Sequence, residues 1–160
     1  MIYLITMKQF LLSGGLLLLA LTGISTNMNG QTKKYPSLNH MALYVVDLER
    51  STAFYRDIIG LEPMEEPFKD GRHSWFKVGE HSQVHVISGA ARATTHDKNT
   101  HLCFSIPSMK DFLEVLRTHN IAFEDWPGKP GAVNKRVDGV QQVYLRDPDG
   151  YWVEINDDKY

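Results

Sequence analysis

The sequence has little cysteine and no marked excess of charge of either sign. Its single cysteine, Cys103, excludes an intrachain disulfide and a cysteine-rich zinc cluster. Lysine and arginine number 17 against 19 acidic residues, and the formal charge of -2 gives no reason to expect nucleic acid or an acidic membrane surface as a partner. Because Cys103 falls inside a predicted strand, we interpret it as a small core residue rather than a nucleophile.

Long apolar runs are also missing, except near the N-terminus. There FLLSGGLLLLALTG follows Lys8, and small and polar residues come next. This pattern predicts a secretory signal peptide over residues 1–30, with cleavage after Ser25 or near Gly30, because the run is too short for a comfortable membrane span. We therefore expect a periplasmic or secreted domain at 31–160 with no stable membrane span. An uncleaved membrane anchor is the alternative.

The rest of the chain repeats itself. When His40 is laid on His101, the segment HMALYVVDLERSTAFY falls over HLCFSIPSMKDFLEVL. In both copies a histidine opens a short apolar run, and a turn and an amphipathic helical pattern follow. The two patterns end at Gly60 and Asn120, residue types that tolerate the left-handed conformation closing a helix. The repeat predicts a duplicated unit with one histidine at the same place in each half.

Each unit is predicted to be a β-α-β-β-β module, which makes the fold class α+β. Module one covers residues 37–89 and module two residues 100–157. The strands and helices are predicted by periodicity at 38–46, 48–59, just after 61, 74–78 and 83–88, and then at 101–106, 108–120, 121–124, 140–145 and 151–155. A polar linker at 90–99 joins the modules, and the loop 126–139 is long enough to be a functional lip.

Four residues of metal-binding types occupy equivalent positions in the two modules. The last strands also correspond, since QVHVIS matches WVEIND, and His85 is therefore the repeat-mate of Glu154. If the modules curl around a pseudo-twofold axis, His40, His101 and Glu154 would offer two imidazoles and a carboxylate to one divalent ion, Zn, Ni, Mn, Fe or Co, and His85 is a candidate fourth ligand. A lone strand histidine is usually structural, but a duplicated fold has no packing need for polar residues at all four positions.

Three motifs resemble the vicinal oxygen chelate superfamily, and glyoxalase I-like proteins most closely. They are NHMALYVVDLERSTAFYRDIIGL, THLCFSI and YLRDPDGYWVEI. The superfamily also includes fosfomycin-resistance transferases, methylmalonyl-CoA epimerases and extradiol dioxygenases. The resemblance implies paired modules forming an open, cup-like mixed β-sheet around one divalent metal ion. It also implies that His40, His101 and Glu154 are the shared ligands, and that His85 stands where glyoxalases usually carry Glu or Gln.

In a glyoxalase-like enzyme the metal chelates two neighbouring substrate oxygens and stabilises an enediolate, which implies a metal-dependent lyase or isomerase on a small substrate. The resemblance makes Glu154 the catalytic proton carrier. Tyr144, on the preceding strand, could point into the same cup, although a strand aromatic is more often a core residue.

The sequence departs from several members. The two glutathione-binding arginines of glyoxalase I match Tyr44 and Asp97, which argues against lactoylglutathione lyase activity. Lys135, Arg136 and Val137 occupy the region where extradiol dioxygenases carry a substrate-contacting histidine. The basic segment of fosfomycin transferases has no counterpart before Tyr160.

Two kinds of alternative stay open. The protein could be a metal-free ligand-binding protein of the bleomycin-resistance type, or a metal-dependent dioxygenase or thiol transferase of the same superfamily. Its modules could pair within one chain or across a homodimer. In the second case His40 and His85 would come from one chain, and His101 and Glu154 from the other.

Overall fold

We describe the protein from a computed structural model. The structure describes residues 35–159. The predicted signal peptide at 1–30 lies outside the described residues. Over residues 35–159, no helix is both long enough and apolar enough to cross a membrane.

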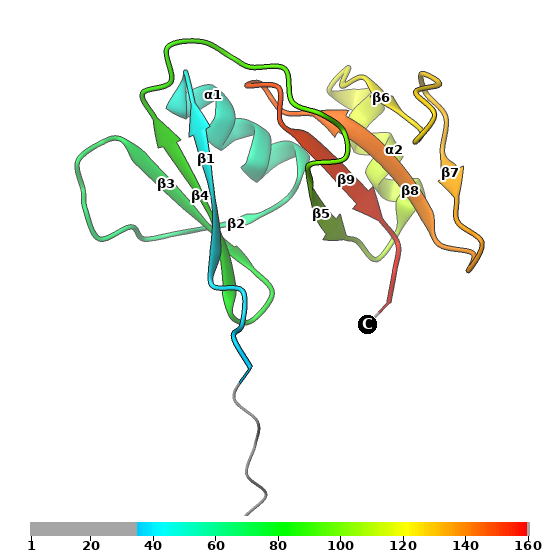
Figure 1. Cartoon of the computed structure of the whole chain (residues 1–160), viewed down its shortest axis with the longest axis horizontal. Coiled ribbons are helices and arrows are strands. Elements are labelled where there is room, and N and C mark those ends of the chain that lie inside the picture. Colours follow the sequence, from blue (N-terminus) through cyan, green and yellow to red (C-terminus); the bar gives the residue numbers. More distant parts are fainter. Residues whose placement is uncertain (1–34, 160) are drawn as a thin grey trace, which may run out of the picture. The chain divides into compact units, whose positions relative to one another are not determined.

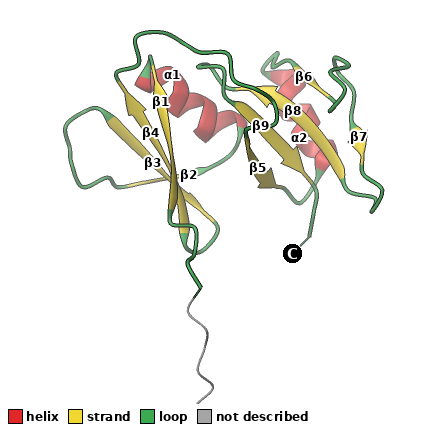
Figure 2. Cartoon of the chain, in the orientation of Figure 1, coloured by secondary structure: helices red, strands yellow, loops and turns green. Residues whose placement is uncertain are grey.

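Module one forms a four-stranded mixed sheet, here called sheet A (Figures 1 and 2). Its order is β1-β4-β3-β2, with β1 and β4 parallel and the other pairs antiparallel. The elements are β1 (His40–Val45), α1 (Leu48–Ala53), η1 (Phe54–Ile58), β2 (Glu62–Met64), β3 (His73–Val78) and β4 (Ser82–Ser88). The predicted elements of this module are thus confirmed.

The helix of module one begins and ends where the sequence indicates, but its second half is wider than an α-helix. The Asp47 side chain caps it by accepting a hydrogen bond from the Arg50 amide. From Phe54 the helix takes π geometry, and the Ile59 amide bonds the Phe54 carbonyl at 3.1 Å. Gly60 then closes it at φ 82°, a left-handed value that glycine adopts without strain.

Module two repeats this plan in sheet B, whose order is β5-β9-β8-β6 with β7 paired to β8. The elements are β5 (His101–Ser105), α2 (Met109–Thr118), β6 (Phe123–Glu124), β7 (Asn134–Lys135), β8 (Gln141–Arg146) and β9 (Trp152–Asn156). Strands β5 and β9 are parallel, as β1 and β4 are in sheet A. The fold class is therefore confirmed. The loop 126–139 differs from the prediction, because part of it forms β7.

One hydrophobic core includes residues of both modules, and a buried turn fastens module two to the helix of module one. The core includes Leu43 and Val45 of β1 together with Val153 and Ile155 of β9. In the turn, the Asp149 carboxylate accepts hydrogen bonds from the Val46 amide and the Ser51 hydroxyl, both at 2.7 Å. The Tyr55 hydroxyl donates to Asp147 at 2.8 Å. We call the side chains of Ser51, Tyr55, Asp147 and Asp149 the latch.

Candidate metal and catalytic site

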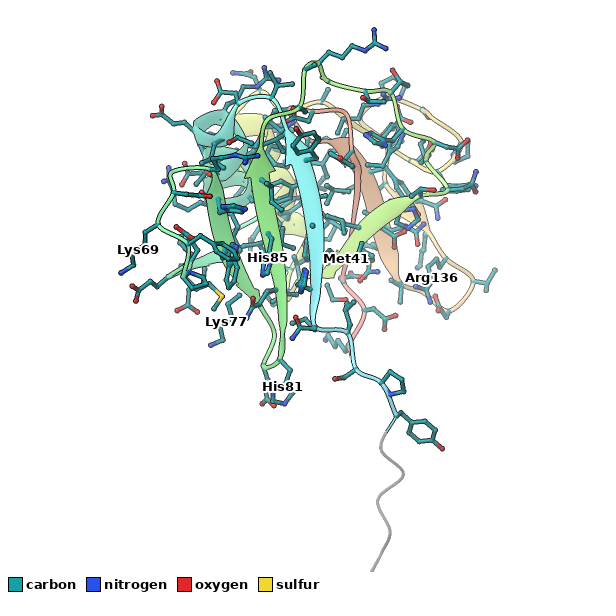
Figure 3. The ribbon with its side chains drawn as sticks, turned by 60° about the vertical axis from the view of Figure 1, so that its left-hand side comes forward. Met41, Lys69, Lys77, His81, His85 and Arg136 are labelled. Atoms are coloured by element: carbon teal, nitrogen blue, oxygen red, sulfur yellow. The ribbon has the colours of Figure 1, made fainter. Side chains whose placement is uncertain are left out.

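The four candidate ligands occupy equivalent places in the two sheets. In sheet A, His40 opposes Gln83. His85, which is labelled in Figure 3, lies two residues further along β4. In sheet B, His101 opposes Trp152, and Glu154 lies two residues further along β9. Side chains alternate along a strand, so each pair projects from one face, opposite the core residues. We call these the outer faces of sheets A and B. The predicted correspondence of His85 with Glu154 is confirmed by this register.

On the outer face of sheet A, three rings form a continuous stack. The His40 and His85 rings lie 4.2 Å apart and 9° from parallel. The Trp75 indole covers the other face of His85, at 3.9 Å and 3°. This sandwich leaves His85 only 8% exposed. Burial, together with the neighbouring His40 and His73, holds the pKa of His85 below its usual value, so His85 is neutral near pH 7.

Hydrogen bonds fix which nitrogen of each histidine in sheet A is free. The Nδ1 atom of His40 lies 2.7 Å from the Asn39 side-chain carbonyl oxygen, which can only accept. Nδ1 must then carry the proton, and Nε2 keeps its lone pair for a ligand. In His85 it is Nε2 that donates to the Gln83 carbonyl oxygen, at 2.7 Å. His40 is therefore the histidine of this pair whose Nε2 is ready to bind a metal.

On the outer face of sheet B, His101 and Glu154 are already in contact. The Nδ1 atom of His101 donates to the Lys98 backbone carbonyl at 2.7 Å, so in the neutral imidazole the lone pair lies on Nε2. That atom lies 3.2 Å from Oε2 of Glu154. Two atoms that both carry lone pairs repel each other at this distance, unless a proton or a cation lies between them. The pair therefore suits a metal ion.

Glu154 is held by a network of polar side chains. Its Oε2 accepts a hydrogen bond from the Tyr144 hydroxyl at 2.6 Å, and its Oε1 accepts one from the Asn156 amide at 3.1 Å. Gln142 donates in turn to Tyr144. Burial by itself raises the pKa of Glu154, but these hydrogen bonds, with Cys103 and His101, bring the pKa below its usual value. The carboxylate is thus ionised and fixed in orientation.

Three further side chains lie near Glu154, and the sequence predicted none of them there. Cys103 is not a core residue: it is exposed on the outer face of sheet B, because it lies two residues after His101 and points the same way. Neighbouring side chains partly shield its thiol from water, and this desolvation, followed by the charge of Glu154, raises the pKa of the thiol to about 12. Gln142 and Asn156 were missed in the sequence, although the alternation of β8 and β9 places both on the same face of sheet B as Glu154.

The linker also contributes to the site. The Lys98 ammonium pairs with Glu124 and donates to the Asp125 and Trp126 carbonyls, both at 3.2 Å. These bonds fix the backbone whose carbonyl orients His101. Orienting the far nitrogen of a histidine in this way is typical of metal ligands, and Asn39 does the same for His40.

The described part of the chain brings the four candidates together as two pairs. His40 contacts His85, and His101 contacts Glu154. Over residues 35–159, no three His, Cys, Asp or Glu side chains lie close enough to hold a metal ion between them. Both free imidazole nitrogens and the ionised carboxylate nevertheless fit a divalent cation. The convergence of all four residues on one ion stays a prediction.

Comparisons with known proteins agree with this architecture. Residues 37–155 match the family model described as Glyoxalase/Bleomycin resistance protein/Dioxygenase superfamily. A lactoylglutathione lyase of Pseudomonas putida is 27% identical in an alignment of 170 positions, which covers 84% of this chain and 92% of that protein. The solved structure of the oxidase ChaP-H1 is 26% identical with a TM-score of 0.64, covering 79% of this chain and 98% of that one.

A fosfomycin resistance protein from Listeria monocytogenes supports the fold alone. Its structure gives a TM-score of 0.61 at 20% identity, covering 77% of this chain and 93% of that one.

Proposed function

We propose that the chain, which belongs to the Glyoxalase/Bleomycin resistance protein/Dioxygenase superfamily, is a metal-dependent enzyme of the glyoxalase type. This superfamily is also called the vicinal oxygen chelate superfamily. The enzyme acts as a lyase or isomerase on a small substrate with two neighbouring oxygens. One observation carries this proposal: Nε2 of His101 faces the ionised Glu154 carboxylate at 3.2 Å, while Nδ1 of the same ring is held by the Lys98 carbonyl. A divalent metal ion is the ligand that satisfies both groups.

The complete site is proposed to form between two copies of the chain. Each copy offers two half-sites, one with His40 and His85 and one with His101 and Glu154. A symmetric dimer that joins the outer face of sheet A in one copy to the outer face of sheet B in the other would build two identical sites. The support for this arrangement is that the two residues of each half-site contact each other, whereas two ligands are too few to hold an ion.

In the proposed reaction Glu154 moves a proton between adjacent substrate carbons. The metal, when bound, supplies Lewis-acid stabilisation of the negative charge that develops on the substrate oxygens. The Glu154 carboxylate removes the proton of the hydroxyl-bearing carbon next to a carbonyl and returns it to the former carbonyl carbon. The hydroxyl proton passes to the former carbonyl oxygen, so the substrate is isomerised with no net loss of atoms. Tyr144 and Asn156 hold the carboxylate while it carries the proton. His40 and His101 hold the ion and exchange no proton.

The substrate is proposed not to be a glutathione adduct, although the P. putida relative is named lactoylglutathione lyase. The two arginines by which glyoxalase I binds glutathione correspond to Tyr44 and Asp97 here. Neither side chain carries the positive charge that a glutathione carboxylate needs. We also propose that residues 1–30 direct export, on the strength of the apolar run after Lys8. N-terminal sequencing of the protein recovered from the periplasm tests this part.

The shared site can be tested by mixing two inactive variants. Refolding His40→Ala together with Glu154→Gln places an intact His40 half-site against an intact Glu154 half-site in each mixed dimer. About a quarter of the wild-type metal sites should return, because half of the dimers are mixed and each holds one intact site. The control mixture is His101→Ala with Glu154→Gln. Both of its lesions fall in the same half-site, so it should recover none.

The amount of metal bound per chain distinguishes the enzyme from a metal-free ligand-binding protein. Wild-type protein grown with Ni, Mn, Fe and Zn should contain about one ion per chain. Barely detectable metal in a folded wild type would overturn the enzyme and favour a metal-free ligand-binding protein. Metal in the wild type without recovery in the mixture would leave the enzyme standing, and would place the whole site in one chain.

A further inference from the structure

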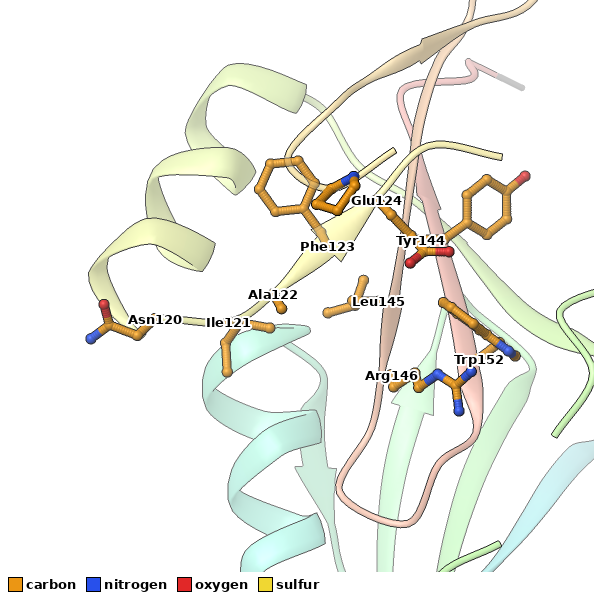
Figure 4. A pocket seen from close by; sticks show the side chains of 10 residues that line it. Asn120, Ile121, Ala122, Phe123, Glu124, Tyr144, Leu145, Arg146 and Trp152 are labelled. Carbon is orange, nitrogen blue, oxygen red and sulfur yellow. The ribbon is translucent and has the colours of Figure 1, made fainter. Parts of the chain in front are cut away.

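Arg146 has no charged or hydrogen-bonding partner and lies on a fixed indole surface. Among the arginines of residues 35–159, only Arg92 and Arg146 make neither a hydrogen bond nor an ion pair. The Arg146 guanidinium lies 4.3 Å from the centre of the Trp152 ring (Figure 4). The indole cannot turn freely, because its Nε1 donates to the His96 carbonyl at 3.0 Å and the residue is 6% exposed. Stacking keeps the N–H donors of Arg146 available at the edge of the guanidinium.

Arg146 projects from the same face of sheet B as the candidate metal ligands and borders a cavity. The cavity has a volume of about 360 Å³, and Glu124, Tyr144, Arg146 and Trp152 are among the residues that line it. This volume falls within the usual range for small-molecule sites. In the register of sheet B, Arg146 opposes Trp152, and Trp152 opposes His101. Two strand spacings therefore separate Arg146 from His101, which is about 10 Å between their backbones.

The charges around this cavity favour an anion. Glu124 is neutralised by its ion pair with Lys98. The same Lys98 ammonium lies 4.7 Å from the centre of the Trp152 ring, so the indole contacts both this neutral ion pair and the Arg146 guanidinium. Asp147, next to Arg146 in sequence, is buried in the latch and bonded to Tyr55. The charge of Arg146 is therefore not balanced by any described neighbour.

We propose that Arg146 binds an anionic group of the substrate, a carboxylate or a phosphate, against Trp152, while the two neighbouring oxygens of the same substrate reach the metal ligands. The planar guanidinium presents paired N–H donors, which match the oxygens of either group. This inference rests on the proposed function, because it gives that substrate class a negative charge a few bonds away from the chelating oxygens. It assigns Arg146 to substrate binding and not to proton transfer.

The first test uses full-length, metal-free protein, with inorganic phosphate and acetate as probes. Both should shift the NMR signals of the Arg146 Nε–H and Trp152 Nε1–H groups. Arg146→Gln should weaken phosphate binding at least tenfold, about the value of one charge-assisted bidentate contact. The matched control is Arg92→Gln, which removes the other unpaired arginine and should leave binding unchanged. A preference for phosphate or for acetate identifies the kind of anion. Equal binding in wild type and Arg146→Gln would overturn the proposal.

The second test uses metal-loaded protein and two probes that share a hydroxyketone group, dihydroxyacetone phosphate and dihydroxyacetone. Wild type should bind the phosphorylated probe at least tenfold more tightly, and Arg146→Gln should lose this preference while keeping its metal affinity. Equal binding of both probes by a metal-loaded wild type would overturn the role of Arg146 and leave the metal site standing. Anion binding at Arg146 in a protein that takes up no metal would instead refute the proposed function.

Discussion

The two modules have the same topology and register but different chemistry on their outer faces. His40 and His101 open equivalent strands, and His85 and Glu154 occupy equivalent positions on the strands beside them. In sheet A the position of Glu154 is filled by a neutral imidazole packed between two rings. In sheet B the same position carries an ionised carboxylate held by hydrogen bonds.

This difference indicates how a duplicated scaffold can divide one task. The sheet A half-site holds its histidines by stacking, and its side chains add no negative charge. The sheet B half-site holds its carboxylate by hydrogen bonds that favour the ionised form, which is what a proton carrier needs. In the proposed enzyme, a single backbone plan would thus supply a neutral half that binds the ion and an anionic half that binds the ion and moves the proton. The comparison predicts that equivalent substitutions will have unequal effects.

The largest expected effect is that of Glu154→Gln. It removes the proton carrier but keeps a carbonyl oxygen that can accept from Tyr144, so turnover should fall about 10³-fold in a folded protein. At the equivalent position, His85→Gln should lower turnover only about tenfold, because Nε2 of His85 is already engaged by Gln83. Steady-state kinetics and circular dichroism measure both. Glu114→Gln, on the exposed face of α2, is the control. Equal losses at 85 and 154 would refute the division of roles.

The next effect concerns the attachment of the modules to each other. Asp149→Ala leaves the Val46 amide and the Ser51 hydroxyl without their acceptor. Loss of a charged acceptor for two donors should lower the free energy of unfolding by about 3 kcal/mol, measured by urea denaturation. Asp57→Ala removes an exposed carboxylate that bonds only its neighbour Arg56, and should change stability little. If the two variants were equally stable, the latch would have no role in holding the modules together.

A smaller effect, on metal affinity, is expected from the side chain that orients His40, because His101 is oriented by a backbone carbonyl instead. Asn39→Ala deletes the acceptor that fixes Nδ1 of His40, and should weaken metal affinity about tenfold with little change in stability. The equivalent acceptor for His101 is the Lys98 backbone carbonyl, which no substitution removes. Asn99→Ala, in the linker, is the matched control. Metal titration followed by calorimetry measures the difference. Unchanged affinity in Asn39→Ala would mean that His40 does not bind the ion through Nε2.

Much of the fold could be predicted from the sequence, because local signals and the repeat agree. Asp47 and Ser108 are observed as helix caps, and Gly60 and Asn120 close the two helices in the left-handed region. The widening of the first helix after Ala53 has no such local signal. Strand β7 was also missed, since Asn134 and Lys135 form a strand only by pairing with Gln141 and Gln142 across the sheet.

The candidate site could be predicted less fully. The repeat pairs His85 with Glu154 correctly, and it indicates the outer face on which each lies. It does not show which nitrogen of a histidine is free, since that depends on acceptors such as Asn39 and the Lys98 carbonyl. Arg146 gives no signal in a single sequence, because an unpaired arginine is recognised only once all its neighbours are known.

The smallest expected effect is a pH dependence that separates two aspartates of module two. Burial, more than any other cause, raises the pKa of Asp147 above its usual value of about 4. Because the carboxyl group ionises less readily in the folded state, its contribution to the free energy of unfolding is greatest below the unfolded-state pKa. This contribution is lost as the pH rises through the folded-state pKa. Asp147→Asn cannot ionise, so it does not lose this stability. Its side-chain oxygen can still accept from the Tyr151 amide, and its NH2 group can donate to the Tyr55 hydroxyl, which reverses that hydrogen bond. Wild type should therefore lose stability relative to Asp147→Asn as pH rises above about 4.

Asp138 should show the opposite sign. Its exposed carboxylate pairs with Arg136, which lowers its pKa, so its contribution is present above the unfolded pKa and is lost as pH falls. Solvent screening keeps this second effect small. Urea denaturation of wild type, Asp147→Asn and Asp138→Asn between pH 3 and pH 7 separates the two slopes. Parallel curves for wild type and Asp147→Asn would mean that the latch carboxylate titrates normally. The cost of burying it would then be fully offset by the hydrogen bonds that it accepts from the Tyr55 hydroxyl of module one and from the Tyr151 and Asp149 amides of its own module.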